Sequence, residues 1–326
     1  MTKATATTEE GAEPTRVVLA LGSGGARGYA HIGVINELKR RGFDIVGVAG
    51  SSMGALVGGV YAAGKLDEFA DWTKTLTQLE MIRLLDVAMA EPGAIRAEKI
   101  LDRIREILGK TQIEDLPIPY IAVATDLSTG RSVWFQRGAL DSAIRASIAI
   151  PGFITPTIAN GRILADGGIL DPLPIIATSG MEGDLVIGVN LNGPASDGEW
   201  GGGDGVRPVD ELVGRLRRGA ERLRAPVNSA FARWAPSLME PEHDPEPTSH
   251  EPRLGRLEVM NRSLELMQAA LARYQRAGNP PDILIDVPRN SAKVLEFHRA
   301  EELIALGEKL MADALDAAGA SSVVNA

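Results

Sequence analysis

Two successive strand-and-helix units near the N-terminus constrain the fold of this 326-residue chain most strongly. Residues 16–21 form a short, apolar and β-branched run that is typical of a buried parallel strand, and a glycine-rich turn follows it. Residues 29–41 then show helical spacing of their apolar side chains. Residues 45–49 indicate a second strand, and residues 52–63 a helix of small residues. This order predicts an α/β fold with parallel strands and right-handed crossovers.

The pattern continues along the chain. Apolar runs predict strands at 120–124, 132–135, 162–165, 185–190 and 283–287, and helical spacing predicts helices at 97–108, 140–147, 254–277 and 291–318. The helix at 254–277 rests on apolar residues three and four apart, namely Leu257, Met260, Leu264, Met267, Leu271 and Tyr274. We predict a disordered segment at 1–15 and a catalytic core at 16–192. An insertion at 193–253 follows, with a glycine-rich part, a basic helix and a part rich in proline and acidic residues. A helix, a strand and a second helix at 254–326 complete the core.

Composition narrows the function classes. The net charge of −9 argues against nucleic-acid binding, and the absence of cysteine excludes disulfides and thiolate chemistry. No signal peptide and no apolar run of membrane-spanning length is present, which predicts a cytoplasmic protein. Residues 206–224 combine arginines with Leu212, Leu216 and Leu223. They predict a peripheral membrane helix, or alternatively a solvated helix that covers the core.

A G-x-S-x-G pattern, Gly50-Ser51-Ser52-Met53-Gly54, lies between the second predicted strand and its helix. This context is what a nucleophile elbow requires, with the serine exposed on a sharp strand-to-helix turn. Gly50 and Gly54 have no side chains, which leaves room for a tight turn. The alternative is that Ser51 or Ser52 only caps the helix.

The glycine loop at residues 22–28 offers a second function. A dinucleotide-binding G-x-G-x-x-G fails in register, because the sixth residue from Gly22 is Arg27. The loop can instead supply an oxyanion hole from the backbone N–H groups of Gly24, Gly25 and Ala26, together with that of Met53. We expect Arg27 to brace the loop or to sense a phosphate. A turn needed only for packing is the alternative.

The base for Ser52 is the remaining question. Of the four histidines, His31 is expected to be packed, His243 and His250 lie in the proline- and acid-rich segment, and His298 is expected in mid-helix. Asp166 ends a short predicted strand and precedes Gly167-Gly168, which permits a tight turn and close approach of another backbone. It is the preferred base, with Asp126 and Asp171 as alternatives.

These residues resemble the bacterial patatin-like phospholipases, in the branch allied to neuropathy target esterase. The similar blocks are L-A-L-G-S-G-G-A-R-G-Y-A-H-I-G-V at 19–34, G-S-S-M-G at 50–54, R-A-S-I-A-I-P-G-F at 145–153, D-G-G at 166–168, and the C-terminal P-P-D-I-L-I and L-E-F-H-R-A-E-E-L-I-A-L-G-E. Ser23 stands where many members have glycine. The resemblance implies a three-layer α/β/α fold with a mainly parallel central sheet, to which the segment around 206–224 adds a helical insertion.

The resemblance also implies an activity. Ser52 and Asp166 would form a catalytic dyad, with supporting glycines at Gly28, Gly50, Gly54, Gly167 and Gly168. The implied reaction is hydrolysis of a phospholipid, lysophospholipid or other acyl ester, with no metal or organic cofactor. Two alternatives stay open: an acyltransferase that uses the same serine, and a regulatory adaptor that retains the fold.

Overall fold

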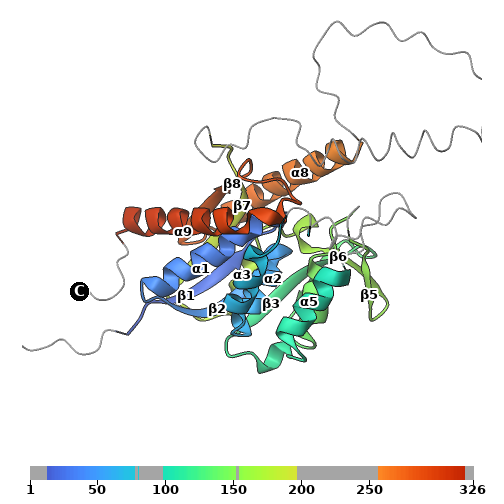
Figure 1. Cartoon of the computed structure of the whole chain (residues 1–326), viewed down its shortest axis with the longest axis horizontal. Helices are drawn as coiled ribbons and strands as arrows, with labels where there is room; N and C mark the ends of the chain where they lie inside the picture. The colour runs from blue at the N-terminus through green and yellow to red at the C-terminus, as the bar shows by residue number, and fades with distance from the viewer. Residues whose placement is uncertain (1–12, 78–79, 81–97, 152–153, 197–255, 320–326) are drawn as a thin grey trace, which may run out of the picture. The chain divides into compact units, whose positions relative to one another are not determined.

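A computed structural model describes residues 13–77, 80, 98–151, 154–196 and 256–319 (Figure 1). These residues belong to one compact unit of the chain. The predicted insertion at 193–253, with its basic segment at 206–224, lies almost wholly outside them, and the domain division stays a prediction.

The described residues form one eight-stranded sheet in the order β5-β6-β3-β2-β1-β7-β8, with β4 paired to β3. Its strands are β1 (Arg16–Leu21), β2 (Asp44–Ser51), β3 (Tyr120–Asp126), β4 (Arg131–Phe135), β5 (Thr157–Ala159), β6 (Arg162–Asp166), β7 (Leu185–Gly193) and β8 (Ile283–Pro288). The pairings of β1, β2, β3, β7 and β8 are parallel, whereas β4, β5 and β6 join antiparallel. The α/β fold with a mainly parallel sheet is therefore confirmed.

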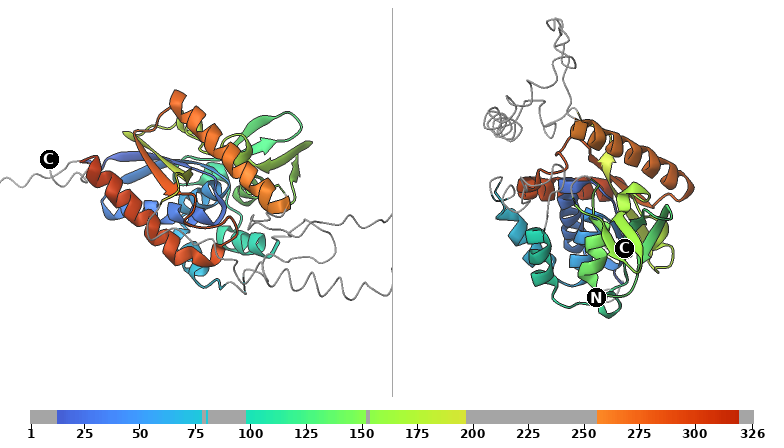
Figure 2. Two further views of the ribbon diagram at one scale, coloured as in Figure 1. Left: turned by 90° about the horizontal axis from the view of Figure 1, so that it is seen from above. Right: turned by 90° about the vertical axis from the view of Figure 1, so that its right-hand side faces the viewer.

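Helices cover both faces of the sheet. They are α1 (Ala30–Arg40), α2 (Met53–Ala62), α3 (Leu66–Lys74), α5 (Glu98–Leu108), α6 (Leu140–Ser147), α8 (Arg256–Gly278) and α9 (Ala300–Ala317). Alternate residues of β1 face opposite layers, as expected for a strand. Leu19 and Leu21 join the main core with α1 and α9, whereas Ala20 packs in a smaller cluster with Ala272 of α8. In Figure 2 (left) α8 and α9 accordingly lie on opposite sides of the strands.

The predicted elements recur with small shifts at their ends, apart from three differences. Helix α3 and the short strand β5 are absent from the predicted ranges. The last helix begins at Ala300 and not at residue 291, and a 3₁₀ turn, η5 (Phe297–Arg299), precedes it. His298 therefore lies before the helix, and its predicted mid-helix position is wrong.

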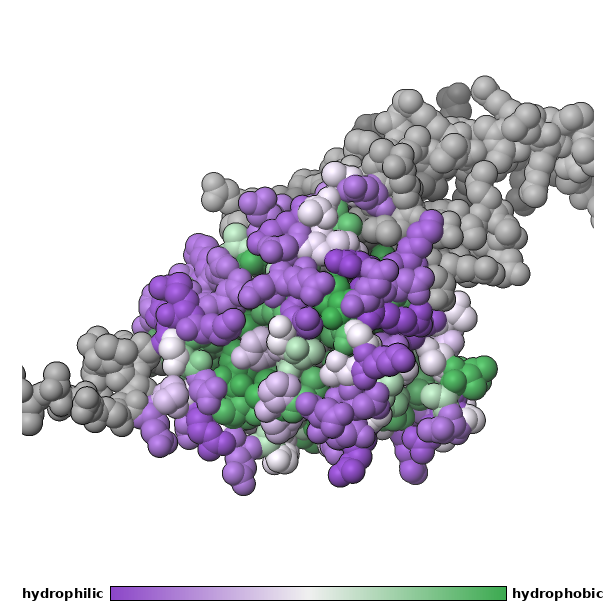
Figure 3. Space-filling model, turned by 60° about the horizontal axis from the view of Figure 1, so that its bottom comes forward, coloured by the Kyte–Doolittle hydropathy of each residue, from purple (hydrophilic) through white to green (hydrophobic). Residues whose placement is uncertain are grey.

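The surface of the described residues is mixed in polarity. On the face in Figure 3, hydrophobic side chains show in small groups between hydrophilic ones, which is ordinary for a folded protein. Among the described helices, none is both long and apolar enough to cross a bilayer.

Candidate active site

The ends of β2 and β6 meet on one edge of β3. Ser51, the last residue of β2, pairs with Val123, and Asp166, the last residue of β6, pairs with the next β3 residue, Ala124. Both strands share this edge because β4 already pairs with the other edge over the same residues. The register therefore places Asp166 beside Ser52, the residue that follows β2.

Ser52 occupies a strained turn between β2 and α2. Its φ of 56° and ψ of −122° are uncommon for a residue with a side chain. Its backbone N–H donates to Oγ of Ser147 at 2.9 Å, and the Ser147 hydroxyl donates to the carbonyl oxygen of Val123 at 2.6 Å. Its φ and ψ lie outside the ordinary N-cap region and its side chain makes no capping hydrogen bond, so the alternative of a simple helix cap is not supported.

Close backbone approaches explain the glycines around this turn. A Cβ added at Gly54 would lie 2.0 Å from the carbonyl oxygen of Leu21, and one at Gly167 would lie 2.1 Å from that of Val123. At all five glycines predicted to support the site, the nearest atom would lie 2.0–2.3 Å from the added Cβ, namely at Gly28, Gly50, Gly54, Gly167 and Gly168. No real Cβ tolerates such contacts, so the elements that carry the site pack this closely only because these residues are glycines.

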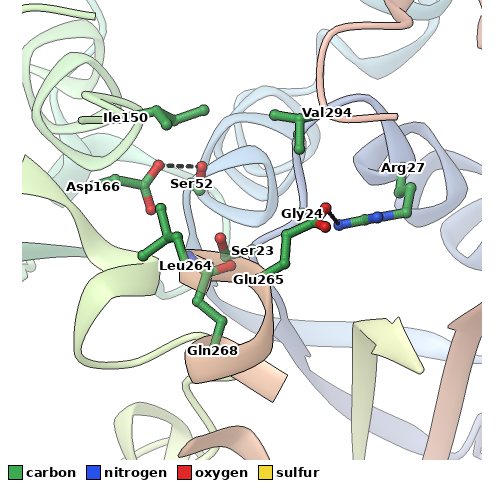
Figure 4. A pocket seen from close by; sticks show the side chains of 11 residues that line it. Ser23, Gly24, Arg27, Ser52, Ile150, Asp166, Leu264, Glu265, Gln268 and Val294 are labelled. Carbon is green, nitrogen blue, oxygen red and sulfur yellow. Dashed lines mark hydrogen bonds and ion pairs between the residues drawn. The ribbon is translucent and has the colours of Figure 1, made fainter. Parts of the chain in front are cut away.

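The Ser52 hydroxyl and the Asp166 carboxylate are directly hydrogen-bonded, from Oγ to Oδ2 (Figure 4). The other carboxylate oxygen accepts the Gly168 N–H at 2.7 Å. Asp166 is only 2% exposed. Burial raises the pKa of its carboxyl to about 7, although the hydrogen bonds from Ser52 and Gly168 act in the opposite direction. The pair thus joins a serine to a carboxylate whose proton affinity suits neutral pH.

Backbone N–H groups near Ser52 are available for an oxyanion, with one correction to the prediction. The Ala26 N–H donates to the carbonyl oxygen of Val294 at 2.9 Å, so it is already used. Within the described residues, the N–H groups of Gly24, Gly25 and Met53 have no recorded acceptor. Gly24 and Gly25 also line the pocket at Ser52, which Ala26 does not.

Arg27 braces the glycine loop. Its side chain is 1% exposed and donates to the carbonyl oxygens of Arg289 and Ala292 at 2.7 and 3.4 Å. It also donates to Oδ1 of Asn192 at 3.2 Å and pairs with Glu265 at 2.9 Å. These bonds connect the loop to β7, to α8 and to the segment before α9. They favour bracing over phosphate sensing.

Neither of the two histidines that the structure describes, His31 and His298, lines the pocket at Ser52. His31 is fully buried, and its Nε2 donates to the carbonyl oxygen of Gly22 at 2.9 Å. Burial lowers the pKa of His31 to about 4, so the ring is neutral at pH 7. His298 lines a different surface depression, together with Arg299, Glu301 and Glu302. His243 and His250 lie outside the described residues.

The two alternative aspartates, Asp126 and Asp171, do not line the pocket at Ser52. The Asp126 side chain accepts hydrogen bonds from the Ser128 N–H and the Thr129 hydroxyl, both at 2.9 Å, in the turn after β3. Burial acts to raise its pKa, but these bonds outweigh it and hold the pKa below its ordinary value. Burial raises the pKa of Asp171 to about 7, yet Asp171 does not line the pocket at Ser52.

The pocket at Ser52 includes residues that the sequence did not identify. Its volume is about 30 Å³, which leaves room for only a few water molecules. Ile150, Val294 and three α8 residues, Leu264, Glu265 and Gln268, complete its lining (Figure 4). Ser147, which holds the Ser52 N–H, was visible only as part of the R-A-S-I-A-I-P-G-F block. No local pattern singles out the α8 residues, since they reach the site through tertiary packing.

No cluster of three or more potential metal-ligating side chains occurs in the part of the chain that the structure describes.

Comparison with known proteins assigns the class. Residues 19–178 match the family model described as patatin-like phospholipase. This match and the fold place the chain among the patatin-like hydrolases of carboxylic esters. An uncharacterized NTE family protein of Mycobacterium tuberculosis is 50% identical over 341 residues, with 94% of this chain and 93% of that protein covered. The chain belongs to the NTE family.

More distant relatives share only part of their length with this chain. Patatin-like phospholipase domain-containing protein 6 of Homo sapiens is 29% identical over 217 residues, which cover 64% of this chain and 16% of the human protein. Lysophospholipase nte1 of Emericella nidulans is 28% identical over 207 residues, which cover 61% of this chain and 13% of that protein.

Proposed function

We propose that this chain hydrolyses acyl esters of lipids, with Ser52 as the nucleophile and Asp166 as its general base. The observation that carries the proposal is the hydrogen bond between the Ser52 hydroxyl and a buried carboxylate at a strained elbow. A serine hydroxyl attacks poorly unless a neighbouring base takes its proton.

The reaction would proceed in two steps. Oγ of Ser52 attacks the ester carbonyl carbon while its proton passes to Asp166. The tetrahedral intermediate collapses, and the leaving alcohol takes that proton and leaves an acyl-serine. A water molecule then attacks the acyl carbon and gives a proton to Asp166. The fatty acid departs, and the proton returns to Ser52.

The oxyanion of each intermediate would be held by the N–H groups of Gly24, Gly25 and Met53. Each such donor stabilises a transition state by about 2.7–4 kcal/mol. The N-terminal end of α2, which begins at Met53, adds its positive dipole to the same charge.

The substrate class is proposed from the family. The match to patatin-like phospholipases and the likeness to a protein named lysophospholipase favour a phospholipid, a lysophospholipid or a similar acyl ester. Membrane contact through residues 206–224 stays a separate prediction, because these residues lie outside the described chain.

No structural observation favours the two alternatives. A histidine-dependent acyltransferase would need an imidazole at the site, but the Nε2 of His31 is bonded to a carbonyl oxygen and His298 lies elsewhere. A degenerate adaptor would have no reason to retain the hydrogen-bonded pair of Ser52 and Asp166.

The test uses a fluorophosphonate probe, a short-chain soluble ester and a lysophospholipid. We expect Ser52→Ala to lose labelling and turnover, and Asp166→Asn to lose most of both. Asp171→Asn is the matched control, because Asp171 is also buried with a raised pKa but lies outside the pocket. Equal loss in Asp171→Asn, or turnover retained in folded Ser52→Ala, would contradict the proposal.

A further inference from the structure

Helix α8 exposes large apolar side chains to solvent. Among its described side chains, five are 43–79% exposed: Val259, Met260, Leu266, Met267 and Tyr274. Three of them belong to the repeating apolar positions that predict this helix. In a surface helix such residues normally face the core, so their exposure calls for an explanation.

These side chains gather on one side of the helix. Positions seven apart are close to two full turns apart, so Met260, Met267 and Tyr274 form one row and Val259 and Leu266 an adjacent row. The opposite side faces inward, where Gln268 lines the Ser52 pocket and Ala272 packs against the sheet. Figure 4 shows Leu264, Glu265 and Gln268 extending from α8 toward the pocket.

The exposed charged side chains of α8 between residues 259 and 278 are arginines. From residue 259 to residue 278 the sequence has three arginines and a single carboxylate, Glu265, in a chain of net charge −9. Glu265 is 20% exposed and pairs with buried Arg27. Arg262 lies 3.8 Å from Glu265 but is 56% exposed, and Arg273 is also exposed. The outer face of α8 is therefore apolar and cationic.

We propose that the outer face of α8, defined by Val259, Met260, Leu266, Met267 and Tyr274 with Arg262 and Arg273, docks on an anionic lipid surface. Apolar side chains flanked by arginines suit the boundary between acyl chains and anionic headgroups. The inference rests on the proposed function, since the other side of the same helix lines the pocket where a lipid ester would react. Docking would bring the lipid surface to the helix that lines the Ser52 pocket.

A second copy of the chain fits this face less well. A two-fold contact would bring the same surface of both subunits together, and hence the Arg262 and Arg273 side chains of both copies into one interface. With no exposed carboxylate on α8 between residues 259 and 278, that contact would bury like charges. An anionic surface has the complementary charge.

The test is flotation of the full chain with vesicles of equimolar phosphatidylglycerol and phosphatidylcholine. Met267→Glu places a carboxylate at a position that is 61% exposed, and we expect its vesicle affinity to fall about tenfold. Ala305→Glu is the matched control, because it adds the same charge at an exposed site of α9 in the opposite layer. It should float like wild type. Met267→Ser, which adds no charge, is the second variant and should also weaken binding.

Other outcomes have definite meanings. Equal flotation of Met267→Glu and wild type, or no flotation of wild type, would overturn the inference. A concentration-dependent dimer of wild type that Met267→Glu abolishes, without vesicle binding, would assign the face to a second copy and overturn it too. We also expect Arg262→Ala with Arg273→Ala to lose the preference for phosphatidylglycerol over pure phosphatidylcholine. An unchanged preference would refute the role of these two arginines in the docking surface.

Flotation is separable from chemistry. It needs no turnover, so Ser52→Ala should float like wild type. Vesicle binding together with retained turnover in Ser52→Ala would refute the proposed function and leave the docking surface intact. The reverse result, turnover that needs Ser52 but no flotation, would refute the docking surface alone.

Discussion

The pKa of Asp166 makes the reactivity of Ser52 a function of pH in a range where an ordinary carboxylate does not titrate. If the pKa of the buried carboxyl is about 7, only the fraction of enzyme with an ionised Asp166 can accept the serine proton. That fraction is about 1% at pH 5 and about 90% at pH 8. The rate of Ser52 labelling should therefore rise about 90-fold between these values. A carboxylate with an ordinary pKa near 3.8 would be almost fully ionised at both, and its profile would be flat.

The assay is the pseudo-first-order rate of fluorophosphonate labelling, measured at intervals between pH 5 and pH 8.5 at constant ionic strength. Labelling reports the attack step alone, so later hydrolysis of the acyl-enzyme does not distort the profile. Asp171→Asn is measured in parallel, because burial raises the pKa of Asp171 to about 7 as well.

Two results would refute the reasoning. A flat profile in folded wild type would mean that Asp166 does not titrate near neutrality or is not the base. A profile that disappears in Asp171→Asn would assign the titration to Asp171. We expect that variant to retain the inflection near pH 7.

Three further predictions follow from the same contacts. The raised pKa of Asp166 means that ionising this carboxyl destabilises the folded state. The free energy of unfolding of wild type, measured in urea, should therefore fall relative to that of Asp166→Asn by up to about 4 kcal/mol as the pH rises from 4 to 8. A difference between the two proteins that does not change with pH would contradict the raised pKa. Ser147→Ala leaves the buried Ser52 N–H without its acceptor and should lower the free energy of unfolding by about 1–3 kcal/mol. Ser142 is exposed on the same helix, so Ser142→Ala should leave the stability measured by thermal unfolding nearly unchanged. Gly54→Ala should destabilise by about 1–3 kcal/mol or more through its backbone clash, whereas Gly180→Ala, with open space around it, should change stability little; equal effects would refute the packing argument.

The sequence predicts the elements of the fold well because their patterns are local. The β1 run and the helix at 140–147 have the boundaries that apolar spacing indicates. The meeting of Ser52 and Asp166 depends instead on the register of β2 and β6 along β3, and no local pattern encodes a strand register. The hydrogen-bonded pairing of Ser52 with Asp166 was therefore predictable from the blocks that resemble a family, and only in part from the residues.

Tertiary hydrogen bonds explain where the local predictions fail. The carbonyl oxygen of Val294 accepts the Ala26 N–H, and those of Arg289 and Ala292 accept the Arg27 guanidinium. These bonds hold the segment before α9 in an irregular conformation, although its sequence continues a helical pattern. The same segment accepts the Ala26 N–H, which was predicted as an oxyanion donor. One set of long-range bonds thus accounts for both differences from the local predictions.

Packing explains the glycines in the turns of this site, but it does not explain the backbone of Ser52. Close backbone approach accounts for Gly54 and Gly167 without any reaction, because a side chain there would meet a carbonyl oxygen. Packing does not account for the positive φ of Ser52, since a glycine at that position would relieve the strain. Such strain persists only where the surrounding contacts impose it, here the Ser147 hydrogen bond and the α2 helix start. A strained residue that keeps its hydroxyl against a buried carboxylate therefore supports the proposed chemistry at Ser52, whereas packing explains the glycines.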